Sequence, residues 1–250
     1  MNVKRIAALL ALFCLLMIST APAEGMFPVV LSPDLNPGPA DGFLFEYGIL
    51  TFTQPGEYLL SGSLDQGQIR VDSVTEGKIT LYLNGVSVHN ENGPALFVGE
   101  VDPRLVISLV EGSNNTLSDG KGMPQGEEDP DGVIYSMSDM TIEGTGTLVI
   151  EAGALSGIVS RDDIRITGGI LDIDVPLHGI KGKDSVEISG GDLVIRAGKD
   201  GIKSTNKKDP DRGFLEITGG KISVTCSDDA LSFITACRIT GGEIFVIKEN

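Results

Sequence analysis

Aspartate residues recur at regular intervals in the second half of this sequence. Four successive segments between residues 157 and 242 each open with glycine or alanine and close with a glycine pair. The residues that precede these openings, and the opening of the segment upstream, form one column: Asp131, Ser156, His178, Asp200 and Asp229. Asp162 and Asp184 form a second column, each five residues after an opening glycine. Carboxylates beside glycine-rich corners offer the oxygen ligands that calcium prefers, so both columns predict a calcium site.

An insertion adds further carboxylates to the same region. Residues 206–212 are spliced into the third segment and supply Asp209 and Asp211, while Asp228 doubles Asp229 at the fourth. Like charges at strand spacing repel one another, which favours a cation between them. The candidate calcium ligands are Asp184, Asp200, Asp209, Asp211, Asp228 and Asp229. The alternative is that each aspartate bonds the backbone of its own turn, as aspartates commonly do.

Two lysines mark a second candidate surface. Lys181 and Lys203 occupy equivalent positions one segment apart, each two residues after the opening glycine. We expect them to point outward as a basic ladder that Arg161, Lys183 and Arg212 extend. Such a ladder suits the carboxylates of an acidic sugar chain. In the alternative interpretation the lysines are solvated and balance the nearby aspartates.

No motif of a known catalytic class accompanies these columns. His89 and His178 stand alone and are interpreted as turn residues rather than as bases beside a nucleophile. The sequence lacks a nucleophile elbow, a zinc-protease motif, a phosphate-binding loop and a dinucleotide fingerprint. Cys226 and Cys237 lack metal-ligand spacing and predict buried free thiols rather than a disulfide.

An internal repeat determines the positions of these columns. The openings at Gly157, Gly179 and Gly201 are 22 residues apart, and Ala230 follows after 29 because of the insertion. Each segment holds three short runs of alternating apolar residues and no stretch of helical length. A period of this size indicates a solenoid whose coils bury their apolar faces against their neighbours. We therefore predict an all-β solenoid of about seven coils, forming one domain over residues 43–250.

The first 23 residues have the pattern of a secretory signal peptide. Lys4 and Arg5 precede an apolar run over residues 6–18, and small residues precede Glu24. Residues 24–42 are proline-rich and aperiodic, which predicts a linker. No later stretch is apolar enough to span a membrane. We expect an exported protein, secreted or held at the cell surface.

The charge balance limits the partners. The formal net charge is −16, which disfavours nucleic acid and anionic membranes as partners. An acidic exported protein suits a calcium-rich exterior, although acidity also serves solubility alone. Aromatic residues make up 5% of the chain and tryptophan is absent, so no stacked aromatic platform for sugars is evident.

Several of these segments resemble a known family. The string from Gly179 to Val186, the segment from Gly201 to Ser204, the pair Asp228-Asp229 and the recurring Ile-Thr-Gly-Gly are similar to secreted bacterial carbohydrate-binding β-helix proteins. The upstream segment from Gly56 to Gly62 also resembles the opening coils of that family. The resemblance covers residues 43–250. It implies a right-handed parallel β-helix that binds polygalacturonate and cellulose-type polysaccharide with calcium, held by Asp184, Asp200, Asp228 and Asp229.

We therefore expect a non-catalytic, calcium-supported module that binds acidic plant-type polysaccharide, with Lys181 and Lys203 assisting. A polysaccharide lyase of the same fold is the enzyme alternative, and a structural surface protein or adhesin is the third. The sequence stops at Asn250 directly after a predicted strand. Because an open strand edge invites pairing, we expect either a truncated product or a second chain, including self-association, at that end.

Overall fold

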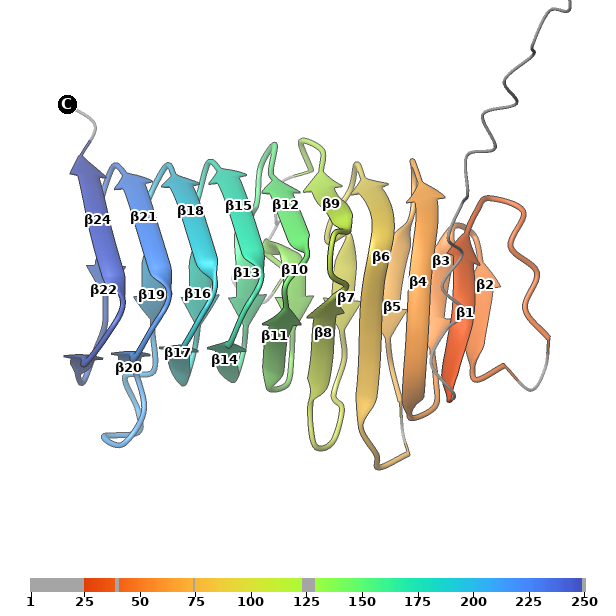
Figure 1. Cartoon of the computed structure of the whole chain (residues 1–250), viewed down its shortest axis with the longest axis horizontal. Coiled ribbons are helices and arrows are strands. Elements are labelled where there is room, and N and C mark those ends of the chain that lie inside the picture. The colour runs from red at the N-terminus through yellow and green to blue at the C-terminus, as the bar shows by residue number, and fades with distance from the viewer. Residues whose placement is uncertain (1–24, 39–40, 74, 123–128, 249–250) are drawn as a thin grey trace, which may run out of the picture.

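All regular elements in the described part of the chain are β-strands (Figure 1). The structure is a computed structural model and describes residues 25–38, 41–73, 75–122 and 129–248. Within these ranges the chain has no helix that could serve as a membrane span. The predicted signal peptide, residues 1–23, lies outside the described residues.

From residue 96 onward, each turn of the chain contributes three strands. The first strands of the turns are β7 (Leu96–Val98), β10 (Gly132–Ser136), β13 (Ser156–Ser160), β16 (Ile180–Gly182), β19 (Ile202–Ser204) and β22 (Leu231–Ser232). The second strands are β8 (Leu105–Leu109), β11 (Met140–Gly144), β14 (Asp163–Ile166), β17 (Ser185–Ile188), β20 (Phe214–Ile217) and β23 (Cys237–Ile239). The third strands are β9 (Asn114–Asp119), β12 (Thr147–Glu151), β15 (Ile170–Val175), β18 (Asp192–Ala197), β21 (Lys221–Cys226) and β24 (Glu243–Lys248).

Equivalent strands of successive turns pair in parallel and form two sheets. The first strands belong to one sheet of nine strands, and the second and third strands belong to the other, of 15. Apolar residues at every second position stack into buried columns, for example Leu148, Leu171, Leu193 and Ile222, which are 0% exposed. This arrangement is consistent with the predicted β-solenoid, because each turn buries its apolar face only against the turns beside it.

The glycine pairs form the corners before the third strands. The second glycine of each pair adopts a positive φ, 96° at Gly191 and 87° at Gly220. A side chain is strained in that conformation, so the repeated Ile-Thr-Gly-Gly reflects a geometric requirement of the corner.

The first turns contain two longer strands, β4 (Gly56–Leu64) with nine residues and β6 (Ile79–Asn90) with 12. β3 (Ile49–Phe52) and β5 (Gln68–Val71) extend the nine-stranded sheet, while β4 and β6 extend the other. β6 pairs with β8 through its first half and with β9 through its second half, so it joins the two series of strands in one sheet.

The N-terminal end is closed by β1 (Met26–Leu31) and β2 (Phe43–Glu46). β1 lies within the proline-rich segment predicted as a linker, and that interpretation is wrong for residues 26–31. β1 pairs in parallel with β4 and buries Val29 and Leu31. Pro28 is tolerated because β1 lies at the edge of its sheet. The aliphatic residues Val29, Val30 and Leu31 pair with the edge of β4, so this segment forms a strand in spite of its prolines.

The last turn of strands has no stacked neighbour in the described part of the chain. β24 pairs with β21, and its Phe245, Val246 and Ile247 are exposed. Cys226 is buried in the turn below, but Cys237 in the last turn is only partly buried. Both thiols are free, as predicted, and the expectation that both are buried fails for Cys237, on which no further turn stacks within residues 129–248.

Candidate functional site

Polar side chains gather at two corners of each turn. We use "entry corner" for the bends of the backbone that lead into β16, β19 and β22. These bends contain His178, Asp200 and Asp229. We use "exit corner" for the bends of the backbone that follow β10, β13, β16 and β19. The residues of this corner are Asp139, Asp162, Asp163, Asp184 and Arg212. Strands of three to five residues separate the two corners. The two aspartate columns of the sequence therefore lie at opposite ends of the strands of the nine-stranded sheet.

At the entry corner, Asp200 is held by a small polar network. Its carboxylate is 6% exposed and accepts a hydrogen bond from Lys203 Nζ at 2.6 Å. The Asp229 backbone N–H donates to the other carboxylate oxygen at 3.2 Å. The Nδ1 atom of His178 lies 3.2 Å from Oδ2 of Asp200 and accepts from the Asp200 N–H at 3.3 Å. The column residue His178 is therefore part of the corner rather than of a catalytic pair.

This network shifts both titrations. Burial alone raises the pKa of Asp200, but the hydrogen bond from Lys203, the Asp229 N–H and the lysine charge together hold this pKa below its ordinary value. The pKa of His178 falls to about 4, chiefly through burial and through the charge of Lys203. At neutral pH the corner thus contains an ionised carboxylate and a neutral imidazole.

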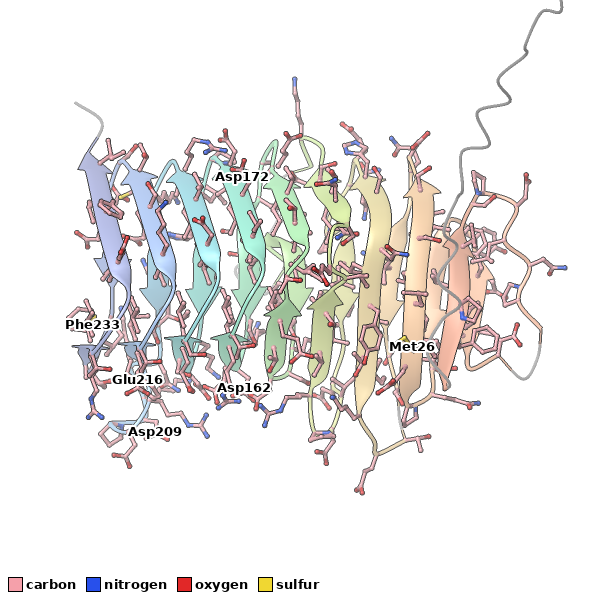
Figure 2. The ribbon with its side chains drawn as sticks, in the orientation of Figure 1. Met26, Asp162, Asp172, Asp209, Glu216 and Phe233 are labelled. Carbon is pink, nitrogen blue, oxygen red and sulfur yellow. The ribbon has the colours of Figure 1, made fainter. Side chains whose placement is uncertain are left out.

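At the exit corner, carboxylates crowd together. One carboxylate oxygen from each of Asp139, Asp162 and Asp163 lies within 4.8 Å of the others. Burial, followed by the neighbouring carboxylates of Asp184, Asp139 and Asp163, raises the pKa of Asp162 to about 6. In Figure 2, Asp162 and Asp209 lie along one side of the stack and Asp172 along the opposite side.

Arg212, from the inserted segment, reaches into this carboxylate cluster. Its NH1 atom lies 2.7 Å from Asp184, 3.4 Å from Asp162 and 3.9 Å from Asp163. Asn206, from the same insertion, donates a hydrogen bond to the other oxygen of Asp184. Arg165 approaches Asp139 at 3.7 Å and Asp163 at 3.6 Å from the far side. The sequence led us to expect that Arg212 extends the lysine ladder. In the structure it compensates the carboxylates of the exit corner instead.

The structure does not bring the six predicted calcium ligands together. Asp184 lies at the exit corner, Asp200 at the entry corner, and the exposed Asp228 and Asp229 lie beside Asp200. Asp209 and Asp211 are exposed residues of the insertion, where Asp209 accepts from the Asp211 N–H. Both oxygens of the Asp200 carboxylate accept hydrogen bonds, one from Lys203 and one from the Asp229 N–H.

The exit corner has the clustered carboxylate oxygens that a calcium site needs. Two of its residues, Asp139 and Asp163, were not among the ligands predicted from the sequence. Asp139 and Asp163, with Asp162, offer clustered carboxylate oxygens of the kind that calcium binds. Asp163 falls beside the second aspartate column, which was the only signal for it. Asp139 belongs to the preceding turn, where the column is not aspartate-rich, so only the stacking of the turns identifies it.

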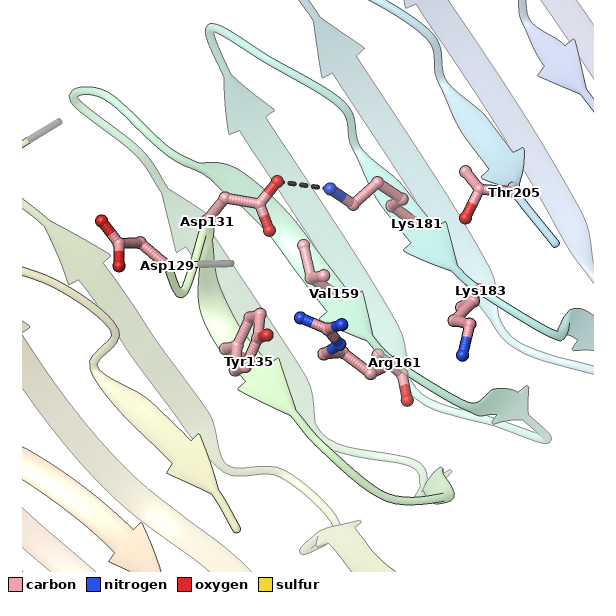
Figure 3. Close-up of a pocket in the computed structure, with 9 residues that line it drawn as sticks. Asp129, Asp131, Tyr135, Val159, Arg161, Lys181, Lys183 and Thr205 are labelled. Atoms are coloured by element: carbon pink, nitrogen blue, oxygen red, sulfur yellow. Dashed lines mark hydrogen bonds and ion pairs between the residues drawn. The ribbon is translucent and has the colours of Figure 1, made fainter. Parts of the chain in front are cut away.

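The two lysines lie in one outward-facing row, as predicted. Strand pairing places Tyr135, Val159, Lys181 and Lys203 side by side on successive strands of the nine-stranded sheet. A shallow depression of about 180 Å³ opens on this row (Figure 3). Its polar lining consists of Asp129, Asp131, Tyr135, Ser160, Arg161, Lys181, Lys183 and Thr205. Three cationic side chains thus face one depression on a strongly acidic protein.

Each lysine of the row is paired with an aspartate, but in different ways. Lys203 pairs with Asp200, three residues earlier in its own turn. Lys181 pairs with Asp131, which precedes β10 two turns earlier, as the dashed line in Figure 3 shows. The sequence placed Asp131 in the first aspartate column but gave no reason to connect it with Lys181. Only the stacking of the turns brings them together.

Comparison with known proteins agrees with this architecture. Residues 47–250 match the model of a family described as "Carbohydrate-binding domain-containing protein". A relative with that description, from Acetivibrio thermocellus, is 35% identical over 143 residues, which are 56% of this chain and 49% of the relative. The chain thus matches about half the length of that relative.

A solved structure is similar over almost its whole length. It is described as the polysaccharide lyase-like protein from C. thermocellum, gadolinium derivative. The TM-score is 0.76 at 31% sequence identity, and the similarity covers 91% of this chain and 96% of the other. The family match spans well over half of the sequence, so this chain belongs to the carbohydrate-binding domain-containing family.

Proposed function

We propose that this protein is an exported, non-catalytic module that binds acidic polysaccharide of the polygalacturonate type. The observation that carries the proposal is the depression on the nine-stranded sheet, where Arg161, Lys181 and Lys183 gather and Lys203 follows in the same row. The family match supports a carbohydrate ligand, and the signal-like residues 1–23 support export. The fold that we propose for it is a right-handed parallel β-helix of about seven coils.

The spacing of the row suits a polymer with regularly repeated charges. Parallel strands lie about 4.8 Å apart, so the side chains of Lys181 and Lys203 leave the sheet at that spacing. With a net charge of −16, the chain repels polyanions in general, and binding must depend on this local basic area. We therefore expect the affinity for a polyuronate to fall as the salt concentration rises, because these charges are partly exposed and are screened.

Affinity electrophoresis and calorimetry with polygalacturonate test the proposal. The double variant Lys181→Ala/Lys203→Ala should lose most of the binding. Lys221→Ala, an exposed lysine on the other sheet, is the matched control and should bind as the parent does. If the parent chain does not retard in the gel with polygalacturonate, the proposed ligand class is wrong.

Calcium is part of this proposal, and the exit corner is the place that suits it best. Asp139, Asp162 and Asp163 would hold the ion, with Asp184 beside them, and the ion would neutralise carboxylates that Arg212 and Arg165 compensate only in part. Calcium should raise the melting temperature and a chelator should lower it, since a ligand that binds only the folded state stabilises it. Asp139→Asn should remove this response, whereas Asp228→Asn should keep it. An unchanged melting temperature in calcium would exclude the ion.

A polysaccharide lyase is the second candidate, supported by the description of the similar solved structure as lyase-like. A lyase needs a base that removes the proton α to a uronate carboxylate, and the lysines and Arg161 of the depression are the groups in reach of such a ligand. Ultraviolet detection of unsaturated uronate ends after incubation with polygalacturonate at alkaline pH separates the two functions. Product that disappears in Lys181→Ala would favour the lyase.

A further inference from the structure

The basic depression already contains a carboxylate. Asp131 forms an ion pair with Lys181 across the depression, reaching over the strand that carries Val159. The two side chains are 26% and 23% exposed, so solvent and a ligand can both approach them. A protein carboxylate thus lies where a carboxylate of the ligand would meet Lys181.

The neighbouring pair in the same row differs in how firmly its aspartate is held. The carboxylate of Asp200 is 6% exposed and also accepts from the Asp229 N–H, so it cannot leave Lys203 without being left buried. Asp131 is anchored through its backbone instead, because its carbonyl accepts from the Ser156 N–H at 2.8 Å. Its carboxylate can rotate into solvent while this backbone bond stays intact.

We propose that Asp131 is an internal competitor for the acidic ligand, and that its carboxylate leaves Lys181 when a uronate carboxylate binds. This inference rests on the proposed function and adds a residue that determines affinity and specificity. With Asp131 in place, a neutral sugar gains little from Lys181, whereas an acidic polymer with several carboxylates can displace one aspartate. Asp131 therefore weakens the binding of isolated carboxylates more than that of a polyanion.

The competition predicts a gain of affinity. Replacing Asp131 by asparagine removes the competing charge and leaves the backbone bond to Ser156 in place. A partly exposed ion pair contributes modestly, so the expected gain in affinity for a galacturonate oligomer is about two- to fivefold. A gain of function is informative here because a misfolded variant cannot produce it.

Titration calorimetry of the full chain with a galacturonate oligomer tests the inference. Asp131→Asn should bind more tightly, and the gain should vanish in Asp131→Asn/Lys181→Ala compared with Lys181→Ala alone. Asp174→Asn is the matched control, because it removes one negative charge from the other sheet, where Asp174 pairs with Arg196. It should change the affinity little.

Each contrary result has its own meaning. If the parent chain binds the oligomer and Asp131→Asn binds equally or more weakly, the competitor is refuted while the proposed function stands. If Asp174→Asn gives the same gain, or if the gain persists without Lys181, the effect is one of net charge and the inference is refuted. If neither the parent nor any variant binds the oligomer, the proposed function and the inference both fail.

Discussion

The entry and exit corners of the nine-stranded sheet are built from the same residue type and reach opposite electrostatic states. At the entry corner a single buried carboxylate, Asp200, accepts from an ammonium and a backbone N–H, and its pKa is lowered. At the exit corner several carboxylates share Arg212 and Arg165, and the pKa of Asp162 is raised to about 6. The number of compensating donors per carboxylate, rather than the presence of aspartate, decides the state.

The largest effect should follow from removing the centre of the entry corner. Asp200→Ala leaves Lys203 unpaired and the Asp229 N–H without its acceptor. We expect the free energy of unfolding to fall by about 3 kcal/mol at pH 7, measured by urea denaturation. Asp228→Ala, at an exposed aspartate of the entry corner in the next turn, should change it by less than about 0.5 kcal/mol. Equal effects of the two substitutions would show that the network contributes nothing.

His178 should make the entry corner sensitive to acid. Its pKa is lowered from 6.5 to about 4 in the folded chain, so below pH 6.5 the unfolded chain binds a proton that the folded chain does not. Stability is therefore lost as the pH falls from 6.5 towards 4. His178→Asn should flatten the profile of stability against pH in this window by about 2 kcal/mol. A profile with the parental slope would contradict the buried neutral imidazole. His89→Asn, at a partly exposed histidine, serves as the control.

At the exit corner, Arg212→Met should leave the carboxylates compensated only by Arg165. The guanidinium is 43% exposed, so the expected loss of stability is moderate, about 1.5 kcal/mol at pH 7 without calcium. Arg238→Met is the matched control, because this arginine is 74% exposed and pairs only loosely with Glu216, at 3.6 Å. Thermal unfolding of both variants in a chelator compares them. A loss that does not shrink at low pH, where the carboxylates are protonated, would argue against charge compensation.

The smallest expected effect is a gain in stability, whereas the substitutions at Asp200 and Arg212 are expected to reduce it. The pKa of Asp162 is raised to about 6, so the folded chain binds a proton more tightly than the unfolded chain and its stability falls as the pH rises from about 4 to 6. Asp162→Asn should therefore stabilise the protein above pH 6, in a chelator, and have no such effect at pH 4. Since Asp162 is 41% exposed, we expect only about 1 kcal/mol. Destabilisation by this substitution at pH 7 would show that Asp162 is adequately compensated.

Much of the fold could be predicted from local pattern. The 22-residue period, the alternating apolar residues and the glycine pairs sufficed for an all-β solenoid, because the coils of such a fold share one geometry. The row of Lys181 and Lys203 followed from the same period and is confirmed by strand pairing. The strand β1 was missed because it lacks the repeat and because its pairing with β4 joins segments that no local pattern connects.

The candidate site could be predicted only in part. The columns identified Asp162, Asp184 and Asp200 as corner residues, since the period fixes which residues stack. The two columns correspond to the entry and exit corners, but the calcium prediction drew ligands from both, because the strands between these corners are short and the insertion has no counterpart in other turns. The grouping of six aspartates as candidate calcium ligands therefore reflected proximity in the sequence rather than in space.

The sequence by itself determined the repeat, the buried columns and the outward row of lysines, because each depends only on residues at equivalent positions in successive turns. The tertiary structure decided the partners: Arg212 with Asp184, Asn206 with the same aspartate, and Asp131 with Lys181. These contacts cross turns or leave the repeat, so they depend on how the insertion packs and on where each side chain reaches. Only the tertiary structure decides which charges compensate each other in these pairs, because the partners lie 22 to 50 residues apart in the chain.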